Sequence, residues 1–216
     1  MTHLYFAERF CEINEIKEEQ ALQKFLAGSL FPDIRYISKL PREWTHFSVS
    51  GLPDVLQEAD PFIAGMKFHA WIDEVREEFV ESSGIYNYID LFTEKRKDLF
   101  LKLIEEEILA EFYDGRQWSF CFDTILEEQR QFTASDEEIL YWHSVVQYSM
   151  LCRVSWLLWA SSYLKDALFG VSNEMLYEWS YLLPKLAKEP KCKRHMRGMM
   201  EKIITEIRQA KKSKIL

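Results

Sequence analysis

The strongest helical signal in the chain lies at residues 135–160, which read SDEEILYWHSVVQYSMLCRVSWLLWA. Ser135 and Glu138 fit a capping box, in which the serine hydroxyl and the glutamate carboxylate satisfy free backbone N–H groups at a helix start. Apolar residues then nearly encircle the helix: Leu140, Trp142, Val145, Val146, Met150, Val154, Leu157 and Leu158. A helix that is apolar on most sides is typical of a core position. We therefore expect a buried central helix that runs from Ser135 past Trp156.

The distribution of proline extends the helical prediction to most of the chain. No proline occurs from residue 62 to residue 183, so no proline ring interrupts long helices there. The chain has only 7 Gly and 6 Pro, few for the many tight turns of an all-β protein. The first 60 residues predict a helix near 3–13, another near 17–29, and a loop interrupted by Pro32, Pro41 and Pro53. The predicted fold is all-α: a multi-helix bundle with an irregular N-terminal loop region.

The formal net charge of −8 is divided unevenly along the chain. Residues 185–216 hold eleven Lys or Arg residues and three Glu, a net charge of +8, which leaves −16 for residues 1–184. We expect residues 1–184 to form a single all-α domain and residues 185–216 to form a basic C-terminal helix or tail. Two interpretations of the tail remain open. It is a solvated helix near 196–210 whose basic residues complement the helix dipole, or it contacts an anionic partner such as RNA, anionic lipid or an acidic protein.

The sequence predicts a soluble cytoplasmic protein. Its N-terminus reaches charged residues at Glu8 and Arg9, too early for the apolar region of a secretory signal. No run of about 18 uninterrupted apolar residues is present. The cysteines lie far apart, without the spacing of a disulfide framework or a Cys-x-x-Cys pair, and we expect them to be reduced: Cys11, Cys121, Cys152 and Cys192.

Five residues in the first third of the chain have the identity and spacing of metal ligands. His69 and Asp73 stand four residues apart in a helical pattern, which places both side chains on one helix face. Asp33 and His46 lie in the loop region, and His3 lies at the start of the first predicted helix. Imidazole and carboxylate together suit zinc, manganese or iron. The predicted site holds one or two such divalent ions.

Asp33 is expected on a stiff turn. Gly28 suits the C-cap of the preceding helix, and Pro32 stops that helix. A carboxylate held there is a good third ligand beside His69 and Asp73. A metal ion at such a site polarises a phosphoryl oxygen and lowers the pKa of bound water toward 7. A lone His-x-x-x-Asp is also a common surface or capping pair, so spacing alone leaves that alternative open.

The candidate ligands fall within an ordered series of phrases: His3-Leu4-x-x-Ala7, Phe25-Leu26-Ala27-Gly28-Ser29-Leu30-Phe31-Pro32-Asp33, Thr45-His46-Phe47 and Gly65-x-x-x-His69-x-x-x-Asp73. This series resembles the zinc-dependent phospholipase C family, whose superfamily includes the single-strand-specific zinc nucleases. Parts of it are also similar to the acyl-carrier-protein phosphodiesterases of the HD-type phosphohydrolases: His3-Leu4-x-x-Ala7, Gly28-x-Leu30-x-x-Asp33 and Gly65-x-x-x-His69-x-x-Ile72-Asp73. Both resemblances cover mainly residues 3–76. They imply a helical protein that uses metal ions to cleave phosphodiesters.

Further along, the chain departs from both families. The phospholipase family ends its motif series in a His-x-x-x-Glu pair, and the nearest match here is His143-x-x-x-Gln147, with an amide in place of the carboxylate. The HD-type family has an Asp-His doublet late in the bundle, where this chain offers only Asp114. Glu107, Glu111 and Asp114 share one helix face. They either complete a second metal site or form a solvated acidic face.

Other polar residues have two interpretations each. Arg35 and Arg42 flank Asp33 in sequence, so either can clamp a phosphate group bidentately or pair with a neighbouring acid. His143 lies in the most apolar helix and is expected to be a hydrogen-bonded core residue. His195 lies in the basic tail and is expected on the surface.

The sequence supports two functions. The first is a metal-dependent phosphoesterase, which hydrolyses a small phosphorylated or phosphodiester substrate with metal-activated water. Its metal ligands would be His3, Asp33, His46, His69 and Asp73, and its catalytic residues Asp33, Asp73 and Arg35, with the carboxylates orienting water. The second is a non-catalytic helical interaction protein that retains a structural or vestigial metal site and uses its basic tail for an anionic partner.

Overall fold

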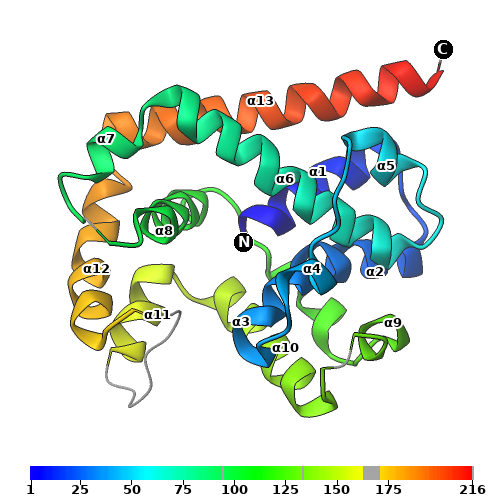
Figure 1. The fold of residues 1–216 in the computed structure, drawn as a ribbon, viewed down its shortest axis with the longest axis horizontal. Coiled ribbons are helices and arrows are strands. Elements are labelled where there is room, and N and C mark those ends of the chain that lie inside the picture. The colour runs from blue at the N-terminus through cyan, green and yellow to red at the C-terminus, as the bar shows by residue number, and fades with distance from the viewer. Residues whose placement is uncertain (94, 133, 163–170, 216) are drawn as a thin grey trace.

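The computed structural model describes residues 1–93, 95–132, 134–162 and 171–215, with the backbone alone for 214 and 215. The prediction of an all-α bundle is confirmed, since these residues form helices and turns without a strand (Figure 1). None of the helices described there is both long and apolar enough to cross a bilayer. The elements are α1 (Thr2–Asn14), α2 (Glu19–Leu30), η1 (Phe31–Ile34), α3 (Arg35–Ser38), α4 (Arg42–Thr45), α5 (Leu52–Leu56), α6 (Pro61–Ser83), α7 (Tyr86–Ile89), α8 (Lys97–Leu109), η2 (Arg116–Phe122), α9 (Glu127–Arg130), α10 (Asp136–Leu151), α11 (Val154–Ser161), α12 (Asn173–Leu186) and α13 (Pro190–Ile215).

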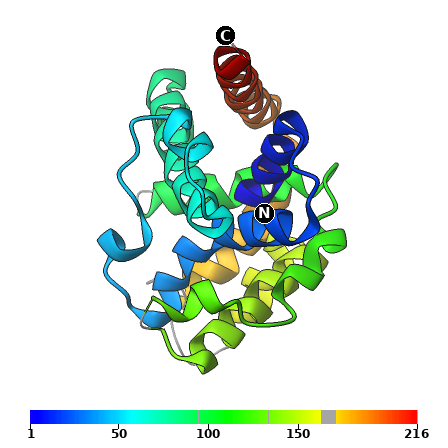
Figure 2. The same ribbon diagram turned by 90° about the vertical axis from the view of Figure 1, so that its right-hand side faces the viewer.

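The helices pack around a group formed by α1, α2, α6 and α13. In Figure 1, α13 runs along the top of the molecule above α6 and α8, and α12 and α11 lie together at one side. Seen end-on in Figure 2, α13 lies above and between α1 and α6. The two predicted N-terminal helices are present as α1 and α2, and the predicted loop region contains the short helical turns η1, α3, α4 and α5.

Two glycines allow α2 and α6 to cross with their backbones in contact. A Cβ atom at Gly28 would overlap the carbonyl oxygen of Phe62, and a Cβ atom at Gly65 would overlap the carbonyl oxygen of Phe25. The prediction that Gly28 is a helix C-cap is therefore wrong, because α2 continues to Leu30. The glycine is needed for close approach, where any side chain would push the helices apart. This crossing fixes the distance between the turn that follows α2 and the second half of α6.

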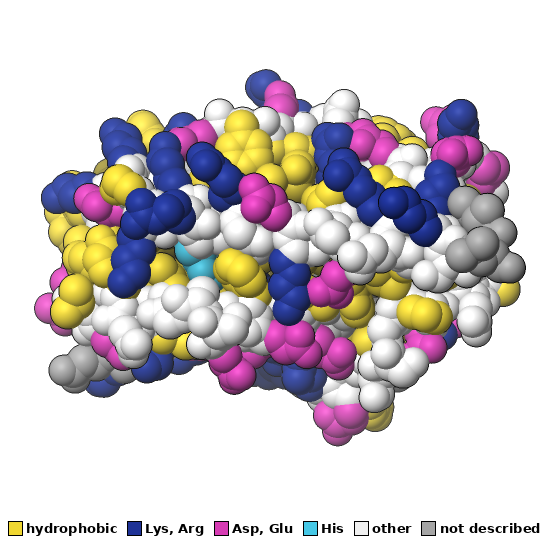
Figure 3. All heavy atoms as spheres, turned by 90° about the horizontal axis from the view of Figure 1, so that it is seen from above, with side chains coloured by type: hydrophobic (Ala, Val, Ile, Leu, Met, Phe, Trp, Pro, Cys, Tyr) yellow, Lys and Arg dark blue, Asp and Glu magenta, His cyan; other side chains and the backbone are white. Residues whose placement is uncertain are grey.

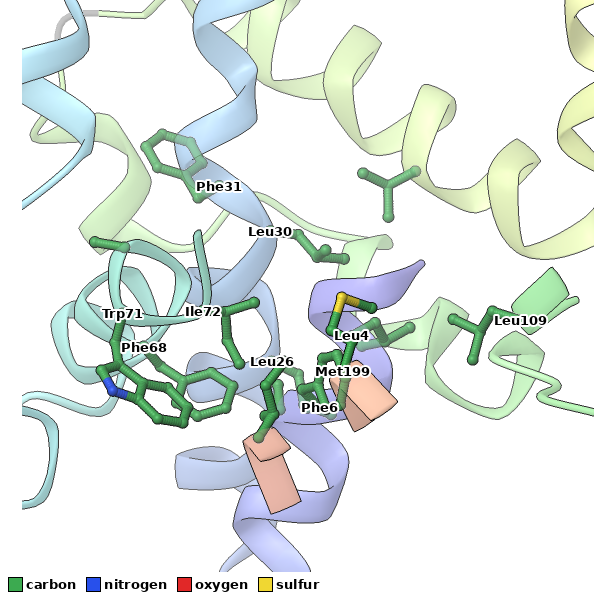
Figure 4. Packing of buried hydrophobic residues seen from close by; sticks show 14 of the residues in the cluster. Leu4, Phe6, Leu26, Leu30, Phe31, Phe68, Trp71, Ile72, Leu109 and Met199 are labelled. Carbon is green, nitrogen blue, oxygen red and sulfur yellow. The ribbon is translucent and has the colours of Figure 1, made fainter. Parts of the chain in front are cut away.

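An aromatic and aliphatic core holds α1 against this crossing. Phe10, Phe25 and Phe68, one from each of α1, α2 and α6, pack with ring centroids 4.9 to 5.5 Å apart. Figure 4 shows Leu4 and Phe6 of α1 lying beside residues of α2, α6 and α13 in the same core. Burial of each such side chain contributes about 1.5 to 3 kcal/mol to folding. The first turn of α1 is therefore anchored inside the molecule.

The basic C-terminal segment is the helix α13, and it packs onto the rest of the chain. It begins at Pro190 and runs to Ile215, so it extends beyond the predicted 196–210 at both ends. One face of it is fully buried at helical spacing, with exposed fractions of at most 1%: Cys192, Met196, Met199, Ile203 and Ile207. This face contacts α1, α6 and α8, so α13 shares the hydrophobic core of the bundle.

The outer face of α13 carries the positive charge. Figure 3 shows Lys and Arg side chains spread over this side of the molecule, with acidic side chains among them. Several of the lysines pair with glutamates of the acidic body, at N–O distances of 2.7 to 3.2 Å: Lys193 with Glu111, Lys202 with Glu78 and Lys211 with Glu15. The uneven charge of the sequence is thus partly neutralised by contacts within the molecule.

A buried ionic cluster joins α6, α8 and α13. Arg76 donates to both carboxylate oxygens of Glu105, at 2.7 Å from Nε and 3.2 Å from Nη2. His195 Nε2 lies 3.0 Å from Glu105 Oε1, and its Nδ1 lies 3.4 Å from the Ser83 hydroxyl. The prediction that His195 lies on the surface is wrong. Its side chain is buried, and Nε2–H donates to the buried Glu105 carboxylate. We call Arg76, Glu105 and His195 the buried clamp.

The prediction of one central helix from Ser135 past Trp156 is also wrong. The capping box itself is present: Glu138 N donates to the Ser135 hydroxyl at 3.2 Å, and Ser135 N donates to the Glu138 carboxylate at 2.8 Å. However, α10 and the following α11 lie at the surface, with Leu140 49% and Trp156 68% exposed. Only one face of α10 is buried.

The helix is interrupted by a carboxylate from α8. Cys152 and Arg153 have extended backbone between α10 and α11. The buried Glu107 accepts hydrogen bonds from Ser155 N and Ser155 Oγ, both at 3.0 Å, and lies 3.3 Å from an Arg153 guanidinium nitrogen. Because a carboxylate at a helix N-terminus satisfies free N–H groups and complements the dipole, Glu107 stabilises a new helix start at this position.

Candidate metal centre

The structure brings all five candidate ligands together from four parts of the chain. His3 comes from the first turn of α1, Asp33 from η1, and His46 from the residue after α4. His69 and Asp73 lie on successive turns of α6, just past the glycine crossing. Both the turn that carries Asp33 and the turns that carry His69 and Asp73 are therefore placed by the contact between α2 and α6.

The donor atoms of the five residues face one another. The Nε2 atoms of His3, His69 and His46 lie 3.4, 3.7 and 3.9 Å from oxygens of Asp73. His69 Nε2 also lies 3.9 Å from Asp33 Oδ1. An ion bound at about 2.1 Å by each ligand has neighbouring donors roughly 3 Å apart and opposite donors roughly 4.2 Å apart. The observed separations fall within that range.

His69 lies at the centre of the arrangement. Two groups of donor atoms within 4.8 Å of one another can be drawn, and both contain it: His3, His69 and Asp73, and Asp33, His46 and His69. His69 is fully buried, and its Nδ1 lies 2.9 Å from the carbonyl oxygen of Ser29. Since a carbonyl only accepts, Nδ1 carries the proton, and Nε2 presents its lone pair to Asp33 and Asp73.

His46 is oriented in the same way by a neighbouring hydroxyl. Thr45 Oγ1 donates to the carbonyl oxygen of Arg42 at 3.4 Å and lies 3.0 Å from His46 Nδ1. The hydroxyl is therefore within hydrogen-bonding distance of His46 Nδ1 and holds the ring in place. This leaves His46 Nε2 facing the Asp73 carboxylate at 3.9 Å.

The three imidazoles form a compact set without hydrogen-bond partners at Nε2. The His3 and His69 rings stack with centroids 3.9 Å apart and an interplanar angle of 9°, and His46 meets His69 edge-on at 5.0 Å. The Nε2 atoms of all three are buried and unpartnered. Buried polar atoms of proteins are nearly always satisfied, so three unpartnered imidazole nitrogens at one point indicate a site for a group such as a metal ion.

Burial also sets the protonation of the centre. Removal from water lowers the pKa of His69 to about 3 and the pKa of His46 to about 4. Burial alone would raise the pKa of Asp73 and Asp33, but the neighbouring imidazoles and Lys102 hold the pKa of both carboxyl groups below the usual range. Neutral imidazoles at His69 and His46 and ionised carboxylates at Asp33 and Asp73 are the protonation states in which these four groups bind metal.

The donor set fits a borderline divalent metal ion. Three imidazole nitrogens and two carboxylates suit zinc, manganese or iron better than magnesium or calcium, which prefer oxygen donors alone. Both groups of donor atoms contain His69, and its single Nε2 atom binds one ion. The arrangement therefore favours one ion with up to five protein ligands. His69 is fully buried, whereas Asp33 is 30% exposed at its side chain, so the centre opens to solvent on the side of Asp33.

Cationic side chains surround the open side. Lys102 of α8, a residue that we did not select from the sequence, places Nζ 3.1 Å from Asp73 Oδ1. Arg42 lies 3.9 Å from Asp73 Oδ2 with its side chain 59% exposed. Arg35 follows Asp33 by two residues, and its Nη2 donates to the Tyr36 hydroxyl at 2.7 Å. Of the two arginines selected from the sequence, Arg42 is therefore the one that contacts a candidate ligand through an ion pair.

The acidic face selected as a possible second site separates into three different environments. Glu107 is buried and caps α11. Glu111 pairs with Lys193 at 2.9 Å, and Asp114 forms hydrogen bonds with Arg116. The three residues form neither a second metal site nor a continuous solvated acidic face. The helix α8 ends at Leu109, so Glu111 and Asp114 do not continue its face.

The pair His143 and Gln147 lies away from the centre. His143 is buried, and its Nε2 accepts from the Gln129 amide at 2.9 Å. This confirms the prediction of a hydrogen-bonded core histidine. Gln147 donates to the carboxylate of Asp123 at 3.0 Å and to a backbone carbonyl. His143 therefore joins α10 to α9 through Gln129 and to η2 through the ring of Phe122, and Gln147 joins α10 to η2.

Comparisons with known proteins assign no family to the chain. No family model matches it, and neither a curated protein nor a solved structure matches it.

Proposed function

We propose that the protein is a metal-dependent phosphoesterase whose centre consists of His3, Asp33, His46, His69 and Asp73. The observation that carries this proposal is the set of three buried, unpartnered Nε2 atoms that face two ionised carboxylates. The order of the corresponding sequence phrases, similar to those of zinc-dependent phospholipases C and of acyl-carrier-protein phosphodiesterases, agrees with hydrolysis of a phosphoric ester.

The residues of the centre have separate roles in this proposal. Zinc, manganese or iron bound there supplies a Lewis acid for the phosphoryl oxygen and an acidified water. The histidines would hold the ion through Nε2; the tautomer of His69 is fixed by Ser29 O, and the His46 ring is held by Thr45 Oγ1. Asp33 lies on the solvent side, where its carboxylate orients the attacking water and accepts its proton.

The surrounding cations neutralise the substrate. Arg42 is exposed and close to Asp73, so its guanidinium can rotate to bind phosphate oxygens in a bidentate manner. Arg35 contributes a second positive charge beside Asp33. An acidic protein with a net charge of −8 needs such local positive charge, together with a metal cation, to bind an anionic substrate.

The proposed location is the cytoplasm. All four cysteines are unpaired, and three of them are buried. Unpaired thiols are typical of a reducing compartment. Labelling of the intact cell with a membrane-impermeant thiol reagent tests this, because exposed Cys152 should react only after lysis.

A metal and activity assay tests the proposed function. Protein purified without chelator is expected to contain close to one equivalent of zinc, manganese or iron by elemental analysis. It should hydrolyse p-nitrophenyl phosphate or bis-p-nitrophenyl phosphate when loaded with one of these ions. Asp73→Asn should abolish the hydrolysis, and Asp90→Asn, which alters an exposed pair with Lys97, should leave it unchanged. Metal binding without turnover of any phosphoric ester would favour the non-catalytic interpretation, and absence of metal would contradict both.

A further inference from the structure

Lys102 makes the shortest contact of Asp73 with any described charged side chain. Its Nζ lies 3.1 Å from Asp73 Oδ1, whereas the histidines and Arg42 lie 3.4 to 3.9 Å from the carboxylate. The same oxygen, Oδ1, faces His3 Nε2 at 3.4 Å. An ammonium group therefore occupies one of the positions around a carboxylate oxygen that also faces a candidate ligand.

A metal ion and Lys102 compete for this oxygen. An ion bound by His3 and Asp73 Oδ1 would lie only a few ångströms from Nζ, and like charges at about 4 Å repel by several kcal/mol in a partly buried site. The pair formed by Lys102 and Asp73 is thus compatible with the metal-free centre and opposed to the metal-bound one. The lysine acts in the metal-free protein as the counter-ion of the carboxylate.

Lys102 can leave Asp73 without a change in the fold. Its side chain is 39% exposed, and four rotatable bonds let the ammonium group swing toward solvent. Its helix is held in place one turn further on by the buried clamp, in which Arg76 of α6 binds Glu105 of α8. The clamp keeps α6 and α8 in register, so only the end of the lysine side chain needs to move.

The charges around the centre indicate what the released lysine binds. Asp33 and Asp73 contribute two negative charges, and Arg35, Arg42 and Lys102 contribute three positive charges. These five side chains sum to about one positive charge, and a divalent ion raises the sum to about three. A phosphate monoester carries nearly two negative charges at neutral pH, and a phosphodiester carries one. The loaded centre is therefore better matched to the monoester.

We propose that Lys102 is exchanged between two anions: it pairs with Asp73 in the metal-free protein and, once a metal ion displaces it, binds the dianionic phosphate of a phosphomonoester substrate. This inference rests on the proposed function, because it needs the metal centre. It adds a substrate class, the phosphomonoester, and a phosphate-binding residue that the sequence motifs do not include.

The experiment compares Lys102→Met with Lys97→Met. Lys97 lies on the same helix and pairs with Asp90 in an exposed position, so it controls for loss of a lysine from α8. Affinity for zinc is measured by competition with a chromogenic chelator. Affinity of the zinc-loaded protein for inorganic phosphate and for dimethyl phosphate, a monoanionic diester, is measured by calorimetry.

The expected changes have opposite signs. Lys102→Met should bind zinc about five- to tenfold more tightly, because the competing cation is gone, and should bind inorganic phosphate about tenfold more weakly, the effect of roughly one lost charged contact. Its affinity for dimethyl phosphate should change about twofold or less. Lys97→Met should match the wild type in all three measurements. Lys102→Gln, which keeps a polar side chain of similar length, should behave like Lys102→Met and provides a second variant if the first fails to fold.

Other outcomes separate the two proposals. Weaker binding of both zinc and phosphate by both variants would mean that Lys102 only supports the structure, and would overturn the exchange while the metal centre remains. Unchanged phosphate affinity, or equal losses for inorganic and dimethyl phosphate, would also overturn it. A wild-type protein that binds no zinc, manganese or iron would contradict the proposed function itself.

Discussion

Two polar clusters meet one turn apart along α6, and they are built in opposite ways. In the buried clamp, Arg76, Glu105 and His195 satisfy one another, and both nitrogens of His195 have partners. In the candidate metal centre, the Nε2 atoms of three histidines are equally shielded from water and have none. Burial alone does not distinguish a structural histidine from a candidate ligand. The partner of Nε2 does.

The largest expected effect is on the clamp. Glu105→Ala removes the buried partner of the Arg76 guanidinium and leaves it only the half-exposed Glu77 at 3.6 Å, which should lower the free energy of unfolding by about 3 to 5 kcal/mol. Urea denaturation measures the change. Glu78→Ala, which removes an exposed pair with Lys202, should shift stability by about 0.5 kcal/mol or less. A cost for Glu105→Ala as small as that of the control would mean that the clamp is not what joins α6, α8 and α13.

The second effect concerns metal binding. At an ion concentration one hundred times the dissociation constant, the folded protein should gain about 2.7 kcal/mol of stability. His69→Ala should lose this gain, because His69 belongs to both groups of donor atoms. His195→Gln, which retains a hydrogen-bond donor for Glu105, should still be stabilised by the metal ion to the same extent as the wild type. Thermal unfolding with and without zinc or manganese measures the difference, and an equal gain in both variants would remove the distinction between the two clusters.

The third effect is a pH dependence of the metal-free protein. The pKa of folded His69 is about 3 and that of folded His46 is about 4, both below the value of 6.5 for a free histidine. As the pH falls below 6.5, the unfolded chain binds protons at these histidines and the folded chain does not. The free energy of unfolding therefore decreases. Each histidine should contribute about 1.4 kcal/mol for every pH unit between 6.5 and 4.

Denaturation at pH 6.5, 5.5 and 4.5 measures this slope. His46→Asn should reduce it, since one titrating histidine is removed, and saturating metal at the higher pH values should mask it. Burial also lowers the pKa of His143, and carboxyl groups with lowered pKa values add to the loss as the pH falls below about 5. Both contributions are common to wild type and variant, so the difference between the two slopes isolates His46. A slope that is the same in wild type and His46→Asn would contradict the assignment.

The smallest effect is expected on the outer face of α13. Lys193, Lys202 and Lys211 pair with glutamates in exposed positions, and exposed pairs contribute about 0 to 1 kcal/mol each. At roughly 0.5 kcal/mol for each pair, replacing all three with Met should lower stability by about 1.5 kcal/mol or less in urea denaturation. A loss comparable to that of Glu105→Ala would show that surface charge, rather than the buried face and the clamp, holds this helix.

The sequence carried enough local information for the bundle and for the pair His69 and Asp73, whereas the set of five candidate ligands depended on the resemblance of the ordered phrases. Helical spacing places His69 and Asp73 on one face, and the phrase around Asp33 marks a turn. The role of Gly28 was misassigned because a glycine near a helix end has the same local signature as a C-cap. Its actual requirement comes from α6, whose residues are distant in the sequence.

The remaining errors have the same origin. Lys102 and His195 are ordinary residues of their own helices, and only packing against α6 brings Lys102 to Asp73 and His195 to Glu105. The break between α10 and α11 depends on Glu107, a residue of a different helix. A helix apolar on several sides predicted a central position, whereas α11 leaves Trp156 exposed. No local pattern contains these partners.

The contact between α1 and α13 has a consequence for folding kinetics. The element that carries His3 packs against the last helix described, so nearly the whole chain must be closed into a loop before the two meet. Closure over such a length costs chain entropy before it is compensated by contacts, and a high contact order slows folding. Assembly of the candidate centre should therefore be among the late events of folding. A metal ion added during refolding should slow unfolding more than it speeds folding.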